Sequence, residues 1–440
     1  MSNLLNFKST LKLLNNIVFL FLLFTFLFGR SFMGLYILNF RIGELLVGVC
    51  LISSILFLLN HKENKLFLSK ELLVTQVIIW FSFLLSLFIN RGSLFTEYTY
   101  KSSSYIWAIS AIYLGIIFFK NFQFDKKRIA ILQLALVYVY ILSTVNYPEF
   151  LINFFLEHSD KWDFNKASTI GIVFIITMLV NNSKITSNKL NSDYFVLISF
   201  LFLPLFLYKS RGAFIGISIF VISQTIIYRK KIFKNEFRTY LVFFLAVVLA
   251  LLSSYRVLDQ NIEELVEEEQ LFSLFYSSQA VEKLAGQKDT KVENFISFYT
   301  RDGRLYSVDG NINWRMQIWQ DVIFDSNKLG TQIFGVGYSE KIPAMNKFER
   351  AGRDGLNENV HNFLFNIYAR GGVVQIILFT VFYFYLYVLN GREKNYNNLI
   401  WFAIPIFIIS FFDTSMENAH FPFLFYFFTS YFLIYNKDLS

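Results

Sequence analysis

The chain has 440 residues, of which 55% are hydrophobic, 20% aromatic and only 16% charged, and its mean hydropathy is +0.46. This composition excludes a soluble globular protein, in which about 25% of residues are charged. The formal net charge of +8 does not indicate nucleic-acid binding, because the location of the basic residues accounts for it. We therefore predict an all-α polytopic membrane protein with no nucleic-acid partner.

Apolar segments recur from one end of the chain to the other, and a transmembrane helix needs roughly 17–25 such residues. With the N-terminus placed in the cytoplasm, the cytoplasmic segments hold 19 Lys and Arg residues and the short external loops hold 8. This asymmetry follows the positive-inside rule and places both termini in the cytoplasm. The segments predict 12 spans, near residues 13–29, 42–59, 71–89, 103–119, 129–146, 167–180, 193–208, 212–228, 239–254, 361–389, 399–412 and 421–435.

These spans divide the chain into three parts. Residues 1–254 hold the first nine spans, residues 255–360 form a large external loop domain, and residues 361–440 hold the last three spans. The loop domain has 12 basic and 17 acidic residues, and its acidic run at 263–269 is expected to be a solvated helix face. Because long loops in compact proteins are usually lids or binding elements, we expect the loop domain to contribute to function.

The first half of the chain predicts three local features. Cys50 is the only cysteine and lies in a span, which excludes an internal disulfide. Glu44 is expected to pair with Arg41, three residues earlier on the same helix face. Residues 147–166 form an external loop whose apolar part is expected to lie along the membrane surface.

An arginine is confined to the external end of a span in the segment PLFLYKSRGAFIGI. Only KSRG separates two apolar stretches, so Arg211 is expected at the membrane boundary. Arginine costs about 2.5–3.5 kcal/mol at the bilayer centre and less near its edge, so we expect an anionic partner, either a ligand or a lipid phosphate. The small residues Gly212, Ala213 and Gly216 would let a neighbouring helix or a ligand approach closely.

A second arginine stands in the loop domain, in the segment NWRMQIWQDV. The spacing of Trp314, Ile318, Val322 and Ile323 predicts an amphipathic helix. Asn313 is a suitable N-cap for it. Arg315 would then lie in the first turn, where free backbone N–H groups and the helix dipole favour an anion such as phosphate. Downstream, the run FGVGYS predicts a glycine turn that would shape this site.

The third candidate lies where the loop domain meets the tenth span, in NVHNFLFNIYARGG. His361 and Asn362 stand at the water-facing mouth of this span, and Arg370 follows about two and a half turns later. Titratable groups at a membrane boundary are functional-site candidates, although a wetted helix start would also explain His361. Asn362 is expected to orient the site or cap the helix.

The predicted topology places Arg211, Arg315 and His361 on the same outer side of the membrane. Two arginines can bind a pyrophosphate bidentately, and a neutral histidine beside them could accept the proton of an attacking hydroxyl. The sequence contains no D-x-D pair, no His-rich or Cys-rich cluster, no Walker A loop and no G-x-S-x-G elbow. A pyrophosphate leaving group needs counter-charge from a metal or from arginines, so the pattern predicts a transferase without a metal or other cofactor.

These motifs, in this order, resemble those of the O-antigen ligase and O-antigen polymerase superfamily. The resemblance rests on SRGA at 210–213, WR at 314–315, GVGYS at 335–339 and HNFLFNIYARGG at 361–372. It implies a GT-C class fold and a donor substrate of undecaprenyl diphosphate that carries a glycan. It also implies that Arg211 and Arg315 bind the pyrophosphate and that His361 is the base.

The implied reaction transfers the glycan to a sugar hydroxyl at the periplasmic face of the bacterial inner membrane and releases undecaprenyl diphosphate. The acceptor is lipid A-core in a ligase and a second lipid-linked glycan in a polymerase. One long late loop that ends in the HN motif favours the ligase. A transporter of anions or of the lipid-linked glycan is the alternative from another class, and the absence of an internal repeat counts against it.

Overall fold

A computed structural model describes residues 2–59, 70–144, 147–159, 166–183, 190–233, 235–258, 298–308, 310–347, 350, 357–389 and 397–435. The acidic run at 263–269 lies outside these ranges. The chain forms two compact units, described separately below. The first unit comprises Met1–Lys70, Ser104–Gln260 and Phe384–Ser440, and the second comprises Glu71–Ser103 and Asn261–Tyr383. The predicted three-part division follows membrane topology instead of packing, and it stays a prediction.

Helices dominate both units. Within the described ranges, 8 helices are long and apolar enough to cross a membrane. They are α1 (Ser2–Met33), α2 (Ile42–Leu59), α4 (Lys70–Ile89), α8 (Lys126–Thr144), α11 (Leu190–Lys209), α12 (Arg211–Ile232), α13 (Glu236–Leu258) and α16 (Phe363–Tyr383), which continues into the π-helical turn η4 (Phe384–Leu389). The shorter apolar helices are α6 (Ser104–Ala108) with α7 (Ala111–Phe119), α10 (Ala167–Ser183), α18 (Asn397–Phe411) and α19 (His420–Tyr435).

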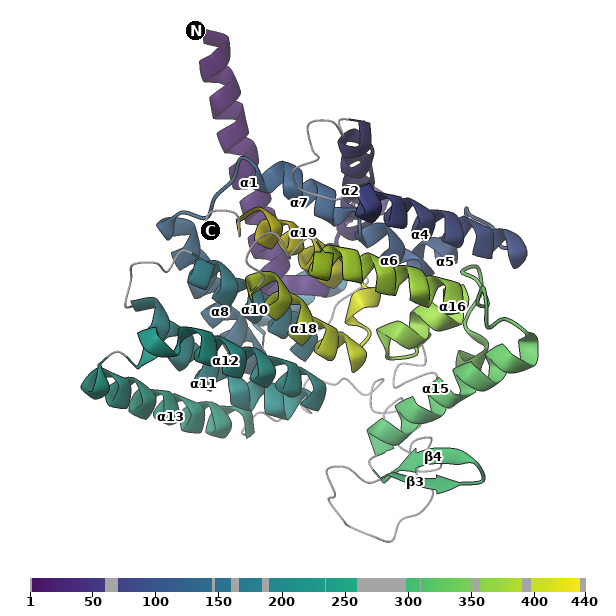
Figure 1. Cartoon of the computed structure of the whole chain (residues 1–440). Coiled ribbons are helices and arrows are strands. Elements are labelled where there is room, and N and C mark those ends of the chain that lie inside the picture. Colours follow the sequence, from purple (N-terminus) through teal and green to yellow (C-terminus); the bar gives the residue numbers. More distant parts are fainter. Residues whose placement is uncertain are drawn as a thin grey trace. The chain divides into compact units, whose positions relative to one another are not determined.

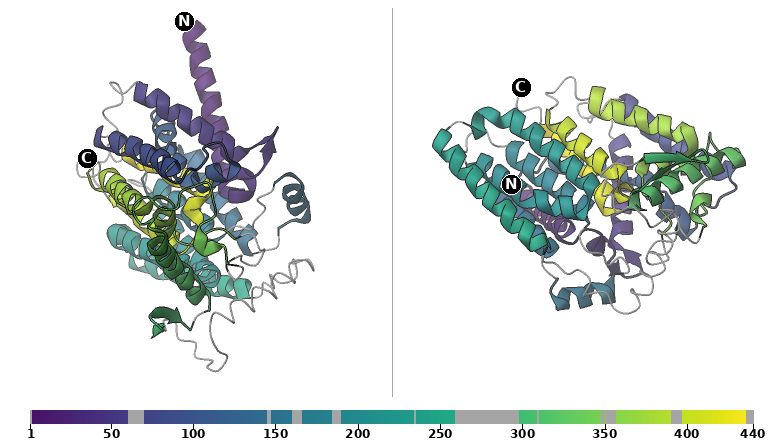
Figure 2. Two further views of the ribbon diagram at one scale, coloured as in Figure 1. Left: turned by 90° about the vertical axis from the view of Figure 1, so that its right-hand side faces the viewer. Right: turned by 90° about the horizontal axis from the view of Figure 1, so that it is seen from below.

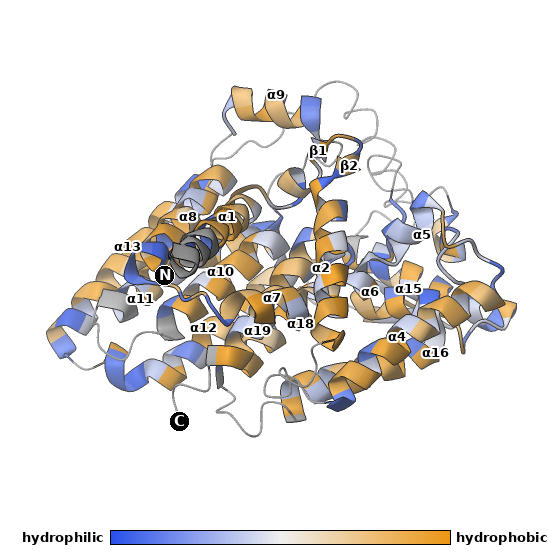
Figure 3. Ribbon diagram, turned by 90° about the horizontal axis from the view of Figure 1, so that it is seen from above, coloured by the Kyte–Doolittle hydropathy of each residue, from blue (hydrophilic) through white to orange (hydrophobic). Residues whose placement is uncertain are grey.

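These helices confirm an all-α polytopic membrane protein. Each of the 12 predicted apolar segments coincides with one of them, while the count of spans and the extent of the external loop stay predictions. Helices such as α2 and α13 are hydrophobic along most of their length (Figure 3), and α13 exposes Phe244 and Leu251, as expected of a lipid-facing surface. Two antiparallel hairpins, which the sequence did not predict, join β1 (Tyr36–Ile37) to β2 (Phe40–Arg41) and β3 (Phe298–Arg301) to β4 (Arg304–Ser307).

Aromatic packing and close helix approach build the first unit. The helices α11, α12 and α13 lie side by side (Figure 2), and α7 packs against α19. The Phe119 ring of α7 lies 4.8 Å from that of Phe427 and 5.0 Å from that of Tyr431, measured between centroids. Such tilted and edge-on contacts suit aromatic rings, which prefer offset or T-shaped arrangements, so the many phenylalanines serve the interior as well as the lipid face.

The small residues after Arg211 serve helix packing. A Cβ on Gly216 would lie 2.8 Å from Cγ1 of Ile409 and 2.8 Å from the carbonyl oxygen of Pro405. A Cβ on Gly212 would lie 2.5 Å from Cβ of Phe412. The structure thus confirms the predicted close approach and identifies its partner as α18 and the residue that follows it.

The structure also describes the predicted Arg41–Glu44 pair and the loop at 147–166 of the first unit. The Arg41 guanidinium donates to Glu44 at 3.0 Å, and the backbone N–H of Arg41 donates to the same carboxylate at 3.0 Å, which confirms the predicted pair. The apolar part of the loop at 147–166 forms α9 (Glu149–His158), on which Phe150 is exposed. Its position along the membrane surface stays a prediction.

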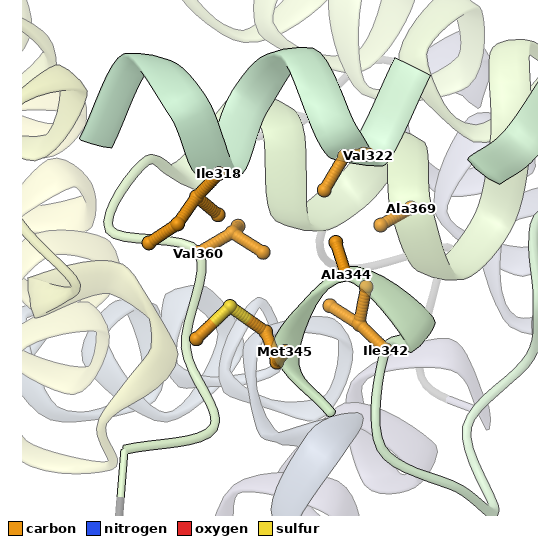
Figure 4. Packing of buried hydrophobic residues seen from close by; sticks show 7 residues of the cluster. All are labelled: Ile318, Val322, Ile342, Ala344, Met345, Val360 and Ala369. Atoms are coloured by element: carbon orange, nitrogen blue, oxygen red, sulfur yellow. The ribbon is translucent and has the colours of Figure 1, made fainter. Parts of the chain in front are cut away.

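The second unit is built around α15 (Gly310–Leu329), with the β3–β4 hairpin beside it (Figure 1). The apolar face of α15 packs on α16 and on the short 3-10 helix η2 (Pro343–Met345). The buried cluster between them, shown in Figure 4, consists of Ile318, Val322, Ile342, Ala344, Met345, Val360 and Ala369. Because Ile318 and Val322 are four residues apart on one helix face, the predicted amphipathic helix is confirmed. The assignment of Ile323 to its apolar face is wrong, since this residue follows Val322 directly, points away from the cluster and is 44% exposed.

Substitution of Gly216 tests the contact between α12 and α18. We expect Gly216→Val to lower the free energy of unfolding by about 1–3 kcal/mol, as over-packing does, because the new side chain meets the Pro405 backbone. Gly48→Val in α2 is the matched control, since a Cβ there meets nothing within 4 Å, and its effect should stay within about 0.5 kcal/mol. Thermal unfolding in one detergent measures both, and equal melting temperatures would contradict the close contact.

Candidate functional site

The helix α16 is broken at Gly372, which has φ 68° and ψ −167°. In a regular helix the N–H groups of Val373 and Val374 would donate to the carbonyls of Ala369 and Arg370. Here they donate instead to Gln332 O at 2.8 Å and Ile333 O at 3.2 Å. The two freed carbonyls accept from Val336 N at 2.8 Å and Gly337 N at 3.1 Å. Residues 332–337 therefore pair with the broken helix through four backbone hydrogen bonds.

Glycines make this pairing possible. The predicted turn in FGVGYS is confirmed, with φ 69° at Gly335 and φ 87° at Gly337, in the left-handed region that glycine tolerates best. A Cβ on Gly335 would lie 2.3 Å from the Arg370 carbonyl oxygen, and one on Gly372 would lie 2.2 Å from the Ile333 carbonyl oxygen. A side chain at either position would therefore collide with the backbone of the other segment, so only glycine fits at both positions.

The guanidinium of Arg370 locks the same region. It is buried and donates to Glu340 O at 2.8 Å, to Gly337 O at 3.3 Å and to the Tyr98 hydroxyl at 2.9 Å. It also lies over the Tyr98 ring, 5.3 Å from its centroid. The α4 side chain of Ser86 donates to Phe334 O at 3.0 Å, so α4, the glycine turn and α16 form one hydrogen-bonded group.

Asn362 caps α16, which is one of the two roles that the sequence predicted for it. Its Oδ1 accepts from Leu364 N at 2.9 Å and from Phe365 N at 3.1 Å, and the side chain is fully buried. These bonds satisfy two N–H groups that a helix start leaves unpaired. The cap orders the first turn of α16, directly after the residue that follows His361.

His361 adopts a left-handed backbone conformation, with φ 55°. This conformation is unusual for a residue other than glycine, and strain of this kind is concentrated at functional sites. The ring of Trp314 lies edge-on to the imidazole, with centroids 4.9 Å apart. Nε1 of Trp319 donates to Val360 O at 2.7 Å. Two tryptophans of α15 therefore hold the segment that presents His361.

The predicted start of the α15 helix is wrong. The helix begins at Gly310, so Asn313 lies inside it and does not cap it. Oδ1 of Asn313 instead accepts from Ser307 N at 3.2 Å and from Gln317 Nε2 at 3.3 Å, which ties β4 to the helix. Arg315 consequently lies in the second turn, beyond the free N–H groups of the helix start, and the argument from the helix dipole does not apply to it.

A carboxylate on α15 gathers three cations. Asp321 accepts from Arg304 at 2.7 Å, from Lys347 at 2.8 Å and from Arg350 at 2.7 Å. Burial alone would raise the pKa of the Asp321 carboxyl, but the hydrogen bonds from Lys347 and Arg304 and the charges of Arg350 and Arg304 outweigh it, so the pKa is lowered. Sequence reasoning missed this cluster, because Asp321 lies up to 29 residues from its cationic partners in the sequence.

The structure brings together some of the predicted residues. The ring of His361, the residue before Asn362, contacts Trp314, the residue before Arg315, and all four lie within the second unit. Arg211 is the first residue of α12, after the N-cap Ser210, and it is exposed at the predicted helix start. It belongs to the first unit, and its convergence with Arg315 and His361 stays a prediction. Within the described ranges, no group of three or more His, Cys, Asp or Glu residues could hold a metal ion.

The segment that carries these features also matches a known family. Residues 195–380 match the family model described as O-antigen ligase, and this range includes Arg211, Arg315, His361 and Asn362. This segment is similar to the O-antigen ligase family. The match confirms the predicted resemblance to the O-antigen ligase and polymerase superfamily. No curated protein matches the chain.

Two glycines of the segment that matches the family model test the broken helix. Gly372 and Gly330 both have φ near +68°, but a Cβ on Gly330 meets nothing within 4 Å. We expect Gly330→Ala to cost about 1–2 kcal/mol of stability, the usual left-handed penalty. Gly372→Ala should cost more than about 4 kcal/mol, because it also separates the paired backbones. Thermal unfolding of the two variants measures the difference, and equal losses would show that residues 332–337 do not lie against α16.

Proposed function

We propose that this protein transfers a glycan from undecaprenyl diphosphate to a sugar hydroxyl at the periplasmic face of the inner membrane. Both termini would face the cytoplasm. The observation that carries the proposal is the contact between the rings of His361 and Trp314. It joins two motifs that are 47 residues apart in the sequence, the WR pair and the HN pair, inside the segment that matches the O-antigen ligase family model.

In the proposed reaction, His361 acts as the general base. The imidazole takes the proton of the acceptor hydroxyl while the hydroxyl oxygen attacks the anomeric carbon of the donor glycan. The bond between that carbon and the diphosphate oxygen breaks, and undecaprenyl diphosphate leaves with the electron pair, so the anomeric configuration inverts. The anchored segment from Val360 to Asn362 holds the base in place, and fixed geometry of this kind lowers the barrier.

Arg211 and Arg315 are the proposed ligands of the diphosphate. A guanidinium can donate two parallel hydrogen bonds to a phosphate group and remains charged throughout the reaction. Two arginines would balance the charge that develops on the leaving group without a metal ion. Arg315 follows Trp314 directly, so the side chain that contacts His361 and the proposed diphosphate ligand lie on the same turn of α15.

The proposed acceptor is lipid A-core, which makes the protein an O-antigen ligase. An O-antigen polymerase, in which a second lipid-linked glycan is the acceptor, would use the same donor and the same three residues. The arrangement of one long late loop that ends in the HN motif supports the ligase, and the family match fits both enzymes.

Removal of the base tests the mechanism. We expect His361→Ala to lower kcat by about 10²–10⁴-fold, the usual contribution of a general base, while the donor still binds. The assay uses purified protein in detergent with a synthetic polyprenyl diphosphate glycan, and donor binding is measured separately. The matched control is His158→Ala, which removes a half-exposed histidine of α9 and should leave transfer unchanged. Full turnover by the His361 variant would contradict the proposal.

Replacement of the loop arginine tests diphosphate binding. Arg315→Lys keeps the charge but loses the two-pronged donor geometry, so we expect donor affinity to fall about tenfold, as for the loss of a hydrogen bond to a charged group. Arg301→Lys, on the exposed strand β3, is the control. Unchanged donor affinity in the Arg315 variant would remove this arginine from the site.

The acceptor decides between ligase and polymerase. We expect transfer when lipid A-core is supplied and no product without it, because a ligase needs the second lipid. A ladder of products with the donor alone would identify a polymerase instead. If no product forms either with lipid A-core or with the donor alone, the transferase proposal fails.

A further inference from the structure

The cationic cluster on α15 contains more positive than negative charge. Asp321 is buried and pairs with Arg304, Lys347 and Arg350. Among the described residues, this leaves an excess of two positive charges, or of one if Asp325, one turn further along α15, is counted as well. An excess of like charge at a partly buried site attracts anions.

Two of the three cations remain accessible. The side chain of Lys347 is 49% exposed and that of Arg304 is 38% exposed, whereas that of Arg350 is only 3% exposed. Arg304 donates through Nη2 to Asp321 and to Gln317 O, while its Nε is buried and has no hydrogen-bond partner within the described ranges. The exposed part of this guanidinium can be approached from solvent while Nη2 holds Asp321.

Stability alone does not account for this arrangement. One buried cation, Arg350, is enough to neutralise Asp321, and half-exposed ion pairs such as those of Lys347 and Arg304 usually add only about 0–1 kcal/mol. Two additional cations on one carboxylate also repel each other. A bound anion would relieve this repulsion.

The cluster is connected to the candidate active site. Nη1 of Arg350 donates to Trp314 O at 3.2 Å, and the Trp314 ring contacts His361. Asp321 follows Trp314 by seven residues, which is two turns, so both face the same side of α15 about 10 Å apart. A chain molecule that reaches His361 could extend along this face to the cations.

The hairpin beside the cluster indicates a sugar ligand. Tyr306 lies two residues after Arg304 on β4 and therefore on the same strand face. It stands opposite Tyr299 of β3, and the two rings stack with centroids 5.5 Å apart. Stacked tyrosines provide an apolar surface with polar edges, which matches the alternating C–H and hydroxyl surface of a sugar ring better than it matches a free phosphate ion.

We propose that Arg304 and Lys347, supported by Arg350, bind an acidic substituent, a carboxylate or a phosphate, on the glycan substrate. The ligand is thus an acidic glycan whose charged group lies about two helical turns from the reacting end. This inference rests on the proposed function, because it assigns a substrate class to the same site. It makes the cluster a determinant of specificity, with no part in the chemical step.

Binding of soluble saccharides tests the inference without turnover. The full chain in detergent is titrated by calorimetry with an oligosaccharide that contains a uronic acid, with a neutral oligosaccharide of equal length, and with inorganic phosphate. We expect the acidic saccharide to bind at least tenfold more tightly than the neutral one. Arg304→Gln and Lys347→Gln should each weaken acidic binding about tenfold and leave neutral binding unchanged.

Lys328→Gln is the matched control, since this lysine in the last turn of α15 lies outside the cluster. Thermal unfolding shows whether the cluster variants remain folded. Equal affinity for the two saccharides, or cluster variants that are folded and bind like the wild type, would show that the cluster is only structural. Tight binding of phosphate without charge-selective saccharide binding would identify a small-anion site and also overturn the inference. A His361→Ala chain should still bind the acidic saccharide, so failure of the transferase proposal is distinguishable from failure here.

Discussion

The exchange of backbone hydrogen bonds at Gly372 is the constraint on which the second unit depends. A break in an apolar helix leaves two N–H groups and two carbonyls unpaired, and each unpaired group costs several kcal/mol in lipid. Residues 332–337 pair with all four groups, so the break is tolerated only with this segment in place. Because the segment and α16 satisfy each other, neither can move without losing the bonds of both.

This coupling extends to the candidate base. Asn362 caps the end of α16 that begins after His361, and Trp319 holds the carbonyl just before His361. The left-handed conformation of His361 is costly by itself, of the order of 1–3 kcal/mol, and it persists because both flanking residues are anchored. A base held in this way needs little rearrangement before it accepts a proton, which is how fixed groups lower a barrier.

The sequence predicted features that depend on local chemistry. Hydropathy located the apolar helices, the glycines of FGVGYS predicted the turn, and the position of Asn362 before an apolar run predicted its capping role. Features that depend on distant pairing were not predictable. The motif ARGG reads as continuous helix, and nothing near Gly372 shows that residues 332–337 replace its hydrogen bonds. The start of α15 was also mistaken, because Asn313 has the chemistry of an N-cap but pairs with Ser307.

Proximity to His361 in the sequence does not decide the role of an arginine. Arg370 lies in the same motif as His361. Its donors are engaged by two carbonyls and a tyrosine hydroxyl, which hold the glycine turn on α16. These partners are neutral dipoles and do not cancel the positive charge of the buried guanidinium, so Arg370 raises the local positive potential. The role of Arg370 is therefore to hold the glycine turn on α16, whereas the proposed ligand role belongs to Arg315.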